Sequence, residues 1–200
     1  ILALSAAPAF AMDEVPRPEL QIGSSWTFKR VDGYSGNVKD TWSQVVTNMG
    51  IGTYEITRYT ESGSVAAKYR ISKNLGQGGP TRFGKKGDGN LYDFPLTAGK
   101  SWTTTNWWVN SSTHSGYDEM NYTVAGKETI KVEAGEFEVI KVVGRGKWVN
   151  ETQPGTANIE ITLYYSPLAQ ATVRSDRVYY SGNGGAPDRD TIELKAYKLN

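Results

Sequence analysis

Few residues in this chain are able to perform acid–base or nucleophilic chemistry. Cysteine is absent, and the one histidine, His114, lies in a Ser- and Gly-rich stretch that predicts a turn. A serine triad would have to use that histidine, and no Gly-x-Ser-x-Gly motif supplies the nucleophile. The usual His and Cys ligands of zinc cannot be assembled either. We therefore predict no catalytic residue, no metal-binding residue and no cofactor.

Oxygen-based chemistry is the remaining option. Calcium binds through oxygens alone, and Asp88-Gly89-Asn90 with Asp93 is the best local cluster, but Lys85 and Lys86 lie beside it and would oppose a cation. A pair of carboxylates could also hydrolyse a glycoside. The candidate carboxylates lie mostly on strand faces expected to be solvated, and their spacing selects no pair: Glu55, Asp118, Glu119, Glu138 and Glu160.

Aromatic side chains that carry a polar edge are the strongest chemical lead. The chain has 6 Trp and 12 Tyr but only 5 Phe. Such rings pack across half-buried sheets, and they also stack on sugars or line apolar grooves. Adjacent aromatic residues in a strand place one ring on each face, so one ring of each pair is expected outside the main core. The predicted ligand-binding residues are Trp102, Trp107, Trp108, Tyr179 and Tyr180.

The elements that would position these rings are strands. Apolar and polar residues alternate with a period of two, most clearly at 65–72, 119–124 and 159–165. Such alternation indicates antiparallel strands with one buried face. No stretch of 12 or more residues has a helical stripe, and turn signals such as Ala134-Gly135 recur at short intervals. We predict an all-β fold of about ten to twelve strands, forming a strongly curved antiparallel sheet, a split barrel or a sandwich.

One strand changes parity along its length. Phe137 and Val139 share one face, whereas Ile140 and Val142 lie on the other. A β-bulge, or a strand that passes from one covered face to another, produces this pattern. Strongly curved sheets and partial barrels need such devices.

The chain contains a short internal sequence repeat. Gly23-Ser24-Ser25-Trp26 is matched by Gly99-Lys100-Ser101-Trp102, and each opens a predicted strand. The repeat suggests two related β-meanders, at about 23–75 and 96–199, joined by a glycine-rich loop at 74–90. The alternative is that Gly-x-Ser-Trp merely suits the start of a strand.

The N-terminal residues indicate export. Residues 1–11 are apolar and end in Ala9-Phe10-Ala11, the small-x-small form of a signal-peptidase site, so we predict cleavage after Ala11. A buried strand or short helix is the alternative. The segment 12–22 contains prolines, and 23–200 is predicted to be a single β domain. The expected location is the bacterial periplasm or the exterior.

The charge balance limits the partners. The chain has 22 Lys and Arg against 21 Asp and Glu, a net charge of +1. No broad field is available to attract nucleic acid or an anionic membrane. We therefore predict no nucleic-acid partner and at most a peripheral association with a membrane.

The second half, about residues 96–199, resembles a recurrent pattern in uncharacterised bacterial envelope proteins. In that pattern a strand and a Gly turn precede an Ala-Gly-x-Phe stretch, as in Ala134-Gly135-Glu136-Phe137. Tyr164-Tyr165-Ser166-Pro167 is similar to the aromatic-Ser-Pro stretch that follows, and 193–197 matches the usual last strand. The family is a domain of unknown function that includes TapB-type proteins. The resemblance implies a β fold in the cell envelope and supplies no catalytic residues.

These observations together predict an exported, non-catalytic periplasmic protein. A concave β surface with Trp and Tyr inside could hold an apolar or lipid-like molecule, or pack on an envelope protein. The first alternative is a carbohydrate-binding β-sandwich, in which Trp107 or Trp108 forms a flat platform. The second is the hydrolase with two carboxylates.

Overall fold

The chain folds into antiparallel β-strands. The computed structural model describes residues 12–76, 90–111, 114–152, 155–182 and 184–200, and these contain ten strands and no helix. The strands are β1 (Ser25–Asp32), β2 (Val38–Gly50), β3 (Thr53–Thr60), β4 (Val65–Ser72), β5 (Ser101–Ser111), β6 (His114–Val132), β7 (Gly135–Asn150), β8 (Gly155–Ser166), β9 (Ala171–Ser181) and β10 (Asp188–Lys198). The prediction of an all-β fold is confirmed.

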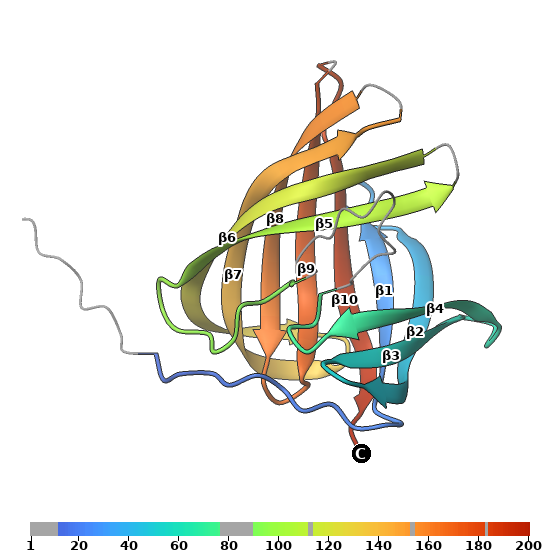
Figure 1. Cartoon of the computed structure of the whole chain (residues 1–200), viewed down its shortest axis with the longest axis vertical. Coiled ribbons are helices and arrows are strands. Elements are labelled where there is room, and N and C mark those ends of the chain that lie inside the picture. Colours follow the sequence, from blue (N-terminus) through green and yellow to red (C-terminus); the bar gives the residue numbers. More distant parts are fainter. Residues whose placement is uncertain (1–11, 77–89, 112–113, 153–154, 183) are drawn as a thin grey trace, which may run out of the picture.

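All ten strands belong to one sheet. Their order is β4-β3-β2-β1-β10-β9-β8-β7-β6-β5, and every pair is antiparallel. The chain starts in the middle of the sheet, meanders to one edge with β4, and re-enters at the other edge with β5. The sheet curls strongly, so that both edge regions fold over β8 to β10 (Figure 1). β4 and β5 are not paired, and the structure is an open, strongly curved sheet rather than a closed barrel.

The longest strands bend at a bulge. β6 gains one residue between Val124 and Gly126 relative to β7. Close to this point, Val139 and Ile140 are adjacent in β7 and both are buried, at 0% and 1% exposure. The parity change predicted from the sequence is therefore confirmed, and it marks the place where the β6–β7 hairpin passes from one core cluster to another.

Two apolar clusters form the core. The first lies under β1 to β3 and includes Trp26, whose indole N–H donates to the carbonyl of Ala169 at 2.8 Å. The second lies under β6 to β8 and includes Tyr92 and Leu96, both fully buried. Burial of these rings and aliphatic side chains supplies the stability that disulfides would otherwise add.

Two irregular segments cross at one end of the sheet. Val15 and Leu96 each donate a backbone hydrogen bond to the other at 2.9 Å. The backbone N–H of Leu20 donates to the Tyr54 hydroxyl at 3.1 Å. The proline-containing segment is therefore attached to both halves of the sheet, and it runs along one end of the molecule (Figure 1). Residues 1–11, with the predicted cleavage site, and most of the glycine-rich loop lie outside the described residues.

The two Gly-x-Ser-Trp stretches have the same local structure. The N–H groups of Gly23 and Gly99 donate to the carbonyls of Val46 and Val124 at 2.8 and 3.0 Å. Both glycines have positive φ, 89° and 74°, a conformation that favours glycine. In both partner strands a bulge follows directly after the valine. The two halves therefore share the local structure that opens a strand, in addition to the three matching residues.

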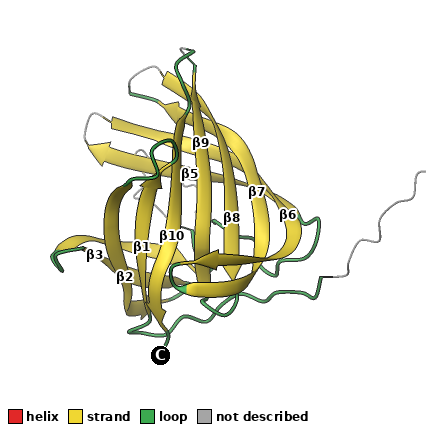
Figure 2. Cartoon of the chain, turned by 180° about the vertical axis from the view of Figure 1, so that it is seen from behind, coloured by secondary structure: helices red, strands yellow, loops and turns green. Residues whose placement is uncertain are grey.

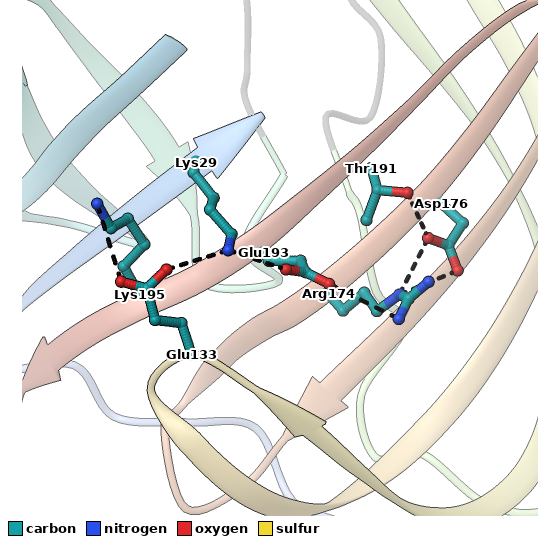
Figure 3. Close-up of polar contacts among 7 residues, drawn as sticks. All are labelled: Lys29, Glu133, Arg174, Asp176, Thr191, Glu193 and Lys195. Carbon is teal, nitrogen blue, oxygen red and sulfur yellow. Dashed lines mark hydrogen bonds and ion pairs between the residues drawn. The ribbon is translucent and has the colours of Figure 1, made fainter. Parts of the chain in front are cut away.

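A row of charged side chains fixes the turn of the β6–β7 hairpin to β10. The Lys29 ammonium lies 3.0 Å from Glu133 in the turn and 3.5 Å from Glu193 in β10. The backbone N–H of Ala134 donates to the Leu194 carbonyl at 3.1 Å. The row continues through Arg174, Asp176, Thr191 and Lys195 (Figure 3). It occupies the convex face, which leaves the concave face for other roles.

Candidate functional site

The concave face of the sheet contains a cavity of about 590 Å³. One side is built by β1 to β4 and the other by β5, β6 and β8 to β10. Its volume lies within the range of small-molecule sites, roughly 300 to 1,000 Å³. The sheet curls so that its two edge regions approach each other (Figures 1 and 2). The residues that line the cavity come from strands on both sides of this curl.

Most of the wall is apolar. Alternate residues of each strand point inward, and β1 to β6 and β8 to β10 each contribute one or more side chains to the wall. Aromatic rings from β1, β2 and β4 face aliphatic side chains from β8 and β10. The apolar lining includes Trp26, Phe28, Trp42, Ile56, Tyr69, Ile71, Ile159, Ile161, Leu163 and Ile192.

Polar side chains are interspersed in this wall. Asn106 from β5, Asp118 from β6, and Arg177 and Tyr179 from β9 all line the cavity. The Nε atom of Arg177 is buried and has no hydrogen-bond partner among the described residues. A buried donor without a partner costs free energy unless a ligand or solvent satisfies it. Arg177 is therefore the first side chain to examine for ligand contact.

Asp190 stands directly opposite Arg177 in the β9–β10 register. Its Oδ1 atom is also buried and has no hydrogen-bond partner in the described chain. Burial raises the pKa of the Asp190 carboxyl above its ordinary value, and the attraction of Arg177 and Arg30 offsets part of that rise. Burial likewise raises the pKa of the Tyr122 and Tyr179 hydroxyls, which stay protonated and able to donate.

The predicted aromatic residues are placed differently from one another. Tyr179 lines the cavity. Tyr180 lies on the opposite face, 37% exposed, and its hydroxyl donates to Glu160 at 3.3 Å. Trp102 stacks on Tyr122 with ring centroids 5.5 Å apart and belongs to the periphery of the second core cluster. Trp107 and Trp108 lie in β5, and their side chains fall outside the described residues.

The other candidate groups are dispersed. Among the predicted carboxylates only Asp118 lines the cavity, whereas Glu138 pairs with Lys127 at 3.2 Å. Of the calcium candidates, Asp93 pairs with Lys100 at 3.0 Å, and Asp88 lies outside the described residues. Within the described part, no three His, Cys, Asp or Glu side chains come together as metal ligands. The side chain of His114 is likewise not described.

Sequence reasoning missed Arg177 and Trp42 as cavity groups, and it missed Asp190 as the neighbour of Arg177. A signal was present for Arg177, because it lies two residues before Tyr179 and therefore shares its face. Asp190 had no such signal, since only the register of β9 with β10 brings it opposite Arg177.

Comparison of the fold with solved structures gives two informative matches. A candidate exported protein with a YmcC-like fold from Bacteroides fragilis aligns with a TM-score of 0.60 at 15% identity, covering 92% of this chain and 99% of that one. This chain has the YmcC-like fold. A candidate lipoprotein from Parabacteroides distasonis aligns with a TM-score of 0.55 at 15% identity, covering 92% and 97%. At this identity the YmcC-like match establishes the fold alone.

Sequence comparisons add no name. No protein-family profile matches the chain, and no curated protein matches it. The TapB-type resemblance stays a prediction, because neither structural match carries that name. No helix in the described residues is long and apolar enough to cross a bilayer.

The raised pKa of Asp190 leads to a prediction on pH. A carboxyl whose pKa is higher in the folded than in the unfolded chain favours folding most when protonated, and this contribution is lost as pH rises through the folded pKa. Asp190→Asn cannot ionise, so its free energy of unfolding minus that of the wild type should increase as pH rises from the ordinary aspartate pKa of 3.8 toward neutrality. Urea unfolding at a series of pH values measures this difference.

The exposed Asp188, two residues earlier, is one of the like charges that raise the pKa of Asp190. For Asp188→Asn the difference from the wild type should therefore change with pH in the same direction as for Asp190→Asn, but by a smaller amount. A difference for Asp190→Asn that falls with pH would show that the ion pair with Arg177 outweighs burial.

Proposed function

We propose that this chain is an exported, non-catalytic binding protein of the bacterial envelope that holds an apolar or lipid-like molecule in the concave cavity. The observation that carries the proposal is the cavity of about 590 Å³, whose lining residues are mainly apolar and include a smaller number of polar ones. Binding sites for small molecules have this composition, mostly apolar with a few polar groups that fix orientation.

The unfilled space of the cavity does not stabilise the fold. Protein interiors pack densely, and unfilled space next to large side chains removes favourable contacts. Trp42 and Ile161 both line this space and both belong to the buried core, at 7% and 8% exposure. A ligand that fills the space would restore the missing contacts, so its binding would stabilise the folded protein.

An envelope location supports the same proposal. The two solved structures with this fold are named as a candidate exported protein and a candidate lipoprotein. The small-x-small site at Ala9-Phe10-Ala11 is consistent with passage through the inner membrane. A carrier or receptor for poorly soluble molecules is useful in that compartment, where such molecules must cross an aqueous space.

Binding of N-phenyl-1-naphthylamine, whose fluorescence rises in apolar surroundings, tests the proposal. We expect saturable 1:1 binding with a Kd of about 1 to 100 μM. Native mass spectrometry of the protein purified gently from a periplasm should also show an added mass that disappears on denaturation. A clean unliganded mass together with no fluorescence increase would overturn the proposal.

A carbohydrate-binding role is the second candidate. It is favoured by the presence of Asn106, Asp118 and Arg177 beside Tyr179, since planar polar side chains next to an aromatic ring suit sugar hydroxyls. Binding of free hexoses or their oligomers, measured by calorimetry and without any binding of the dye, would favour this role over the first.

A further inference from the structure

The charges around the cavity form an alternating series. On β1 to β3, Arg30 binds Asp40 through two contacts of 3.2 and 2.9 Å, and Arg58 lies 3.8 Å from the same carboxylate. The Arg58 guanidinium also lies 4.4 Å from the centre of the Trp42 ring, which lines the cavity. Asp40 is therefore compensated by its two arginine neighbours.

The series continues on β10, β9 and β6. Asp190 is attracted by both Arg30 and Arg177, and Arg177 is its direct neighbour in the sheet. Arg177 and Asp118 both line the cavity, and both act electrostatically on the hydroxyls of Tyr122 and Tyr179. Arg177 therefore has the Asp190 carboxylate beside it in the sheet and shares the cavity wall with the Asp118 carboxylate.

The series has no surplus charge. It contains three arginines, Arg30, Arg58 and Arg177, and three aspartates, Asp40, Asp118 and Asp190. Among the described residues that line the cavity there is neither a lysine nor a glutamate. A charged ligand group brought next to this series would lose its hydration without meeting a net opposite charge, which is costly.

The buried atoms that lack partners are of both kinds. Arg177 Nε and Trp42 Nε1 are donors, and Asp190 Oδ1 is an acceptor; none has a hydrogen-bond partner among the described residues. A hydroxyl group both donates and accepts, so a hydroxyl-bearing group can satisfy donors and acceptor together. A carboxylate offers acceptors only, and a quaternary ammonium offers no hydrogen bond at all.

We infer that the ligand of this cavity is an amphipathic molecule with a neutral, hydroxyl-bearing head, and that the head lies against Arg177 and Asp190 while the tail lies along the aliphatic wall of β8. This inference rests on the proposed function and specifies its ligand class. Arg177 is a positioning residue whose charge is already balanced.

Three probes with the same eight-carbon chain test the inference: octyl β-glucoside, octanoate and octyltrimethylammonium. Each is titrated below its critical micelle concentration to displace bound N-phenyl-1-naphthylamine. We expect octyl β-glucoside to bind about tenfold more tightly than either charged probe, because only the charged heads pay an uncompensated desolvation cost. Tighter binding of octanoate or of the ammonium would overturn the inference.

Two variants change the charge of the series in opposite directions. Arg177→Met leaves a net negative charge, and Asp190→Asn leaves a net positive one. In Arg177→Met, the affinity for octyltrimethylammonium should rise relative to that for octyl β-glucoside. In Asp190→Asn, the affinity for octanoate should rise relative to that for octyl β-glucoside. Unaltered probe preferences in both variants, with dye binding and melting temperature preserved, would show that these residues do not face the head.

The failure of the inference is separable from that of the proposed function. If the dye binds and the three octyl probes compete equally, the cavity binds apolar molecules without discriminating between their head groups. In that case the inference alone is wrong. If the dye does not bind to the wild type and the protein purified from a periplasm carries no added mass, the proposed function itself is overturned.

Discussion

Gly146→Ala is expected to destabilise the protein more than any other glycine substitution in the described sheet. A Cβ atom at this position of β7 would lie 1.9 Å from the backbone oxygen of Glu119 and 2.6 Å from the Met120 sulfur. The sulfur belongs to a flexible side chain, but the oxygen belongs to β6, which is held by β5 on one side and β7 on the other. The methyl group therefore cannot be accommodated without moving paired strands.

The expected cost is at least about 3 kcal/mol, the upper part of the range for overpacked cores. For a chain of this size such a loss lowers the melting temperature by roughly 10 °C. Thermal unfolding followed by far-ultraviolet circular dichroism measures it. Gly182→Ala is the matched control, because its Cβ would approach the Thr156 carbonyl oxygen only to 3.4 Å and the residue is exposed. Equal melting temperatures for the two variants would contradict the packing argument.

Gly146 also illustrates how the site is shaped. Together with Gly144, whose Cβ would lie 2.4 Å from the Tyr122 ring, it removes side chains from the inner face of β7. The absence of side chains lets Tyr122 and Met120 pack close to the backbone of β7, which permits the tight curl. The cavity therefore depends on glycines that contribute no contact of their own to its wall.

The sequence predicted the strands well because their evidence is local. Alternation of apolar and polar residues, the Ala134-Gly135 turn and the parity change in β7 each depend on a few neighbouring residues. The strand order was not predictable in the same way. The pairing of β1 with β10 joins residues at opposite ends of the chain, such as Ser25 and Lys198, and nothing local in either strand specifies its partner.

The site was predicted only in part for the same reason. The adjacent tyrosines were expected to lie on opposite faces, and Tyr179 lines the cavity while Tyr180 meets Glu160 on the other face. Periodicity separates the two faces but does not say which one encloses a cavity. That choice depends on the direction in which the sheet curls. The pairing of Asp190 with Arg177 depends in addition on the register between β9 and β10, which is a tertiary property.

Ser175→Phe is expected to abolish ligand binding while the fold is retained. Ser175 is 4% exposed, lines the cavity, and stands between Leu163 in β8 and Ile192 in β10. A phenyl group at this position would extend into the space that we assign to the ligand tail. Binding of N-phenyl-1-naphthylamine should weaken by about thirtyfold or more, equivalent to roughly 2 kcal/mol.

Stability distinguishes this result from a simple loss of folding. Filling a real cavity commonly stabilises a protein by about 0.5 to 2 kcal/mol, whereas overpacking a dense core destabilises it by about 1 to 3 kcal/mol. We therefore expect the melting temperature of Ser175→Phe to be unchanged or higher. The control is Thr162→Phe, which places the same ring on β8 opposite Asp176, a member of the charged row on the convex face, and should leave dye binding intact. A fall in melting temperature with unchanged dye binding in Ser175→Phe would mean that the dye binds elsewhere, because a ring that overfills the cavity must compete with any molecule inside it.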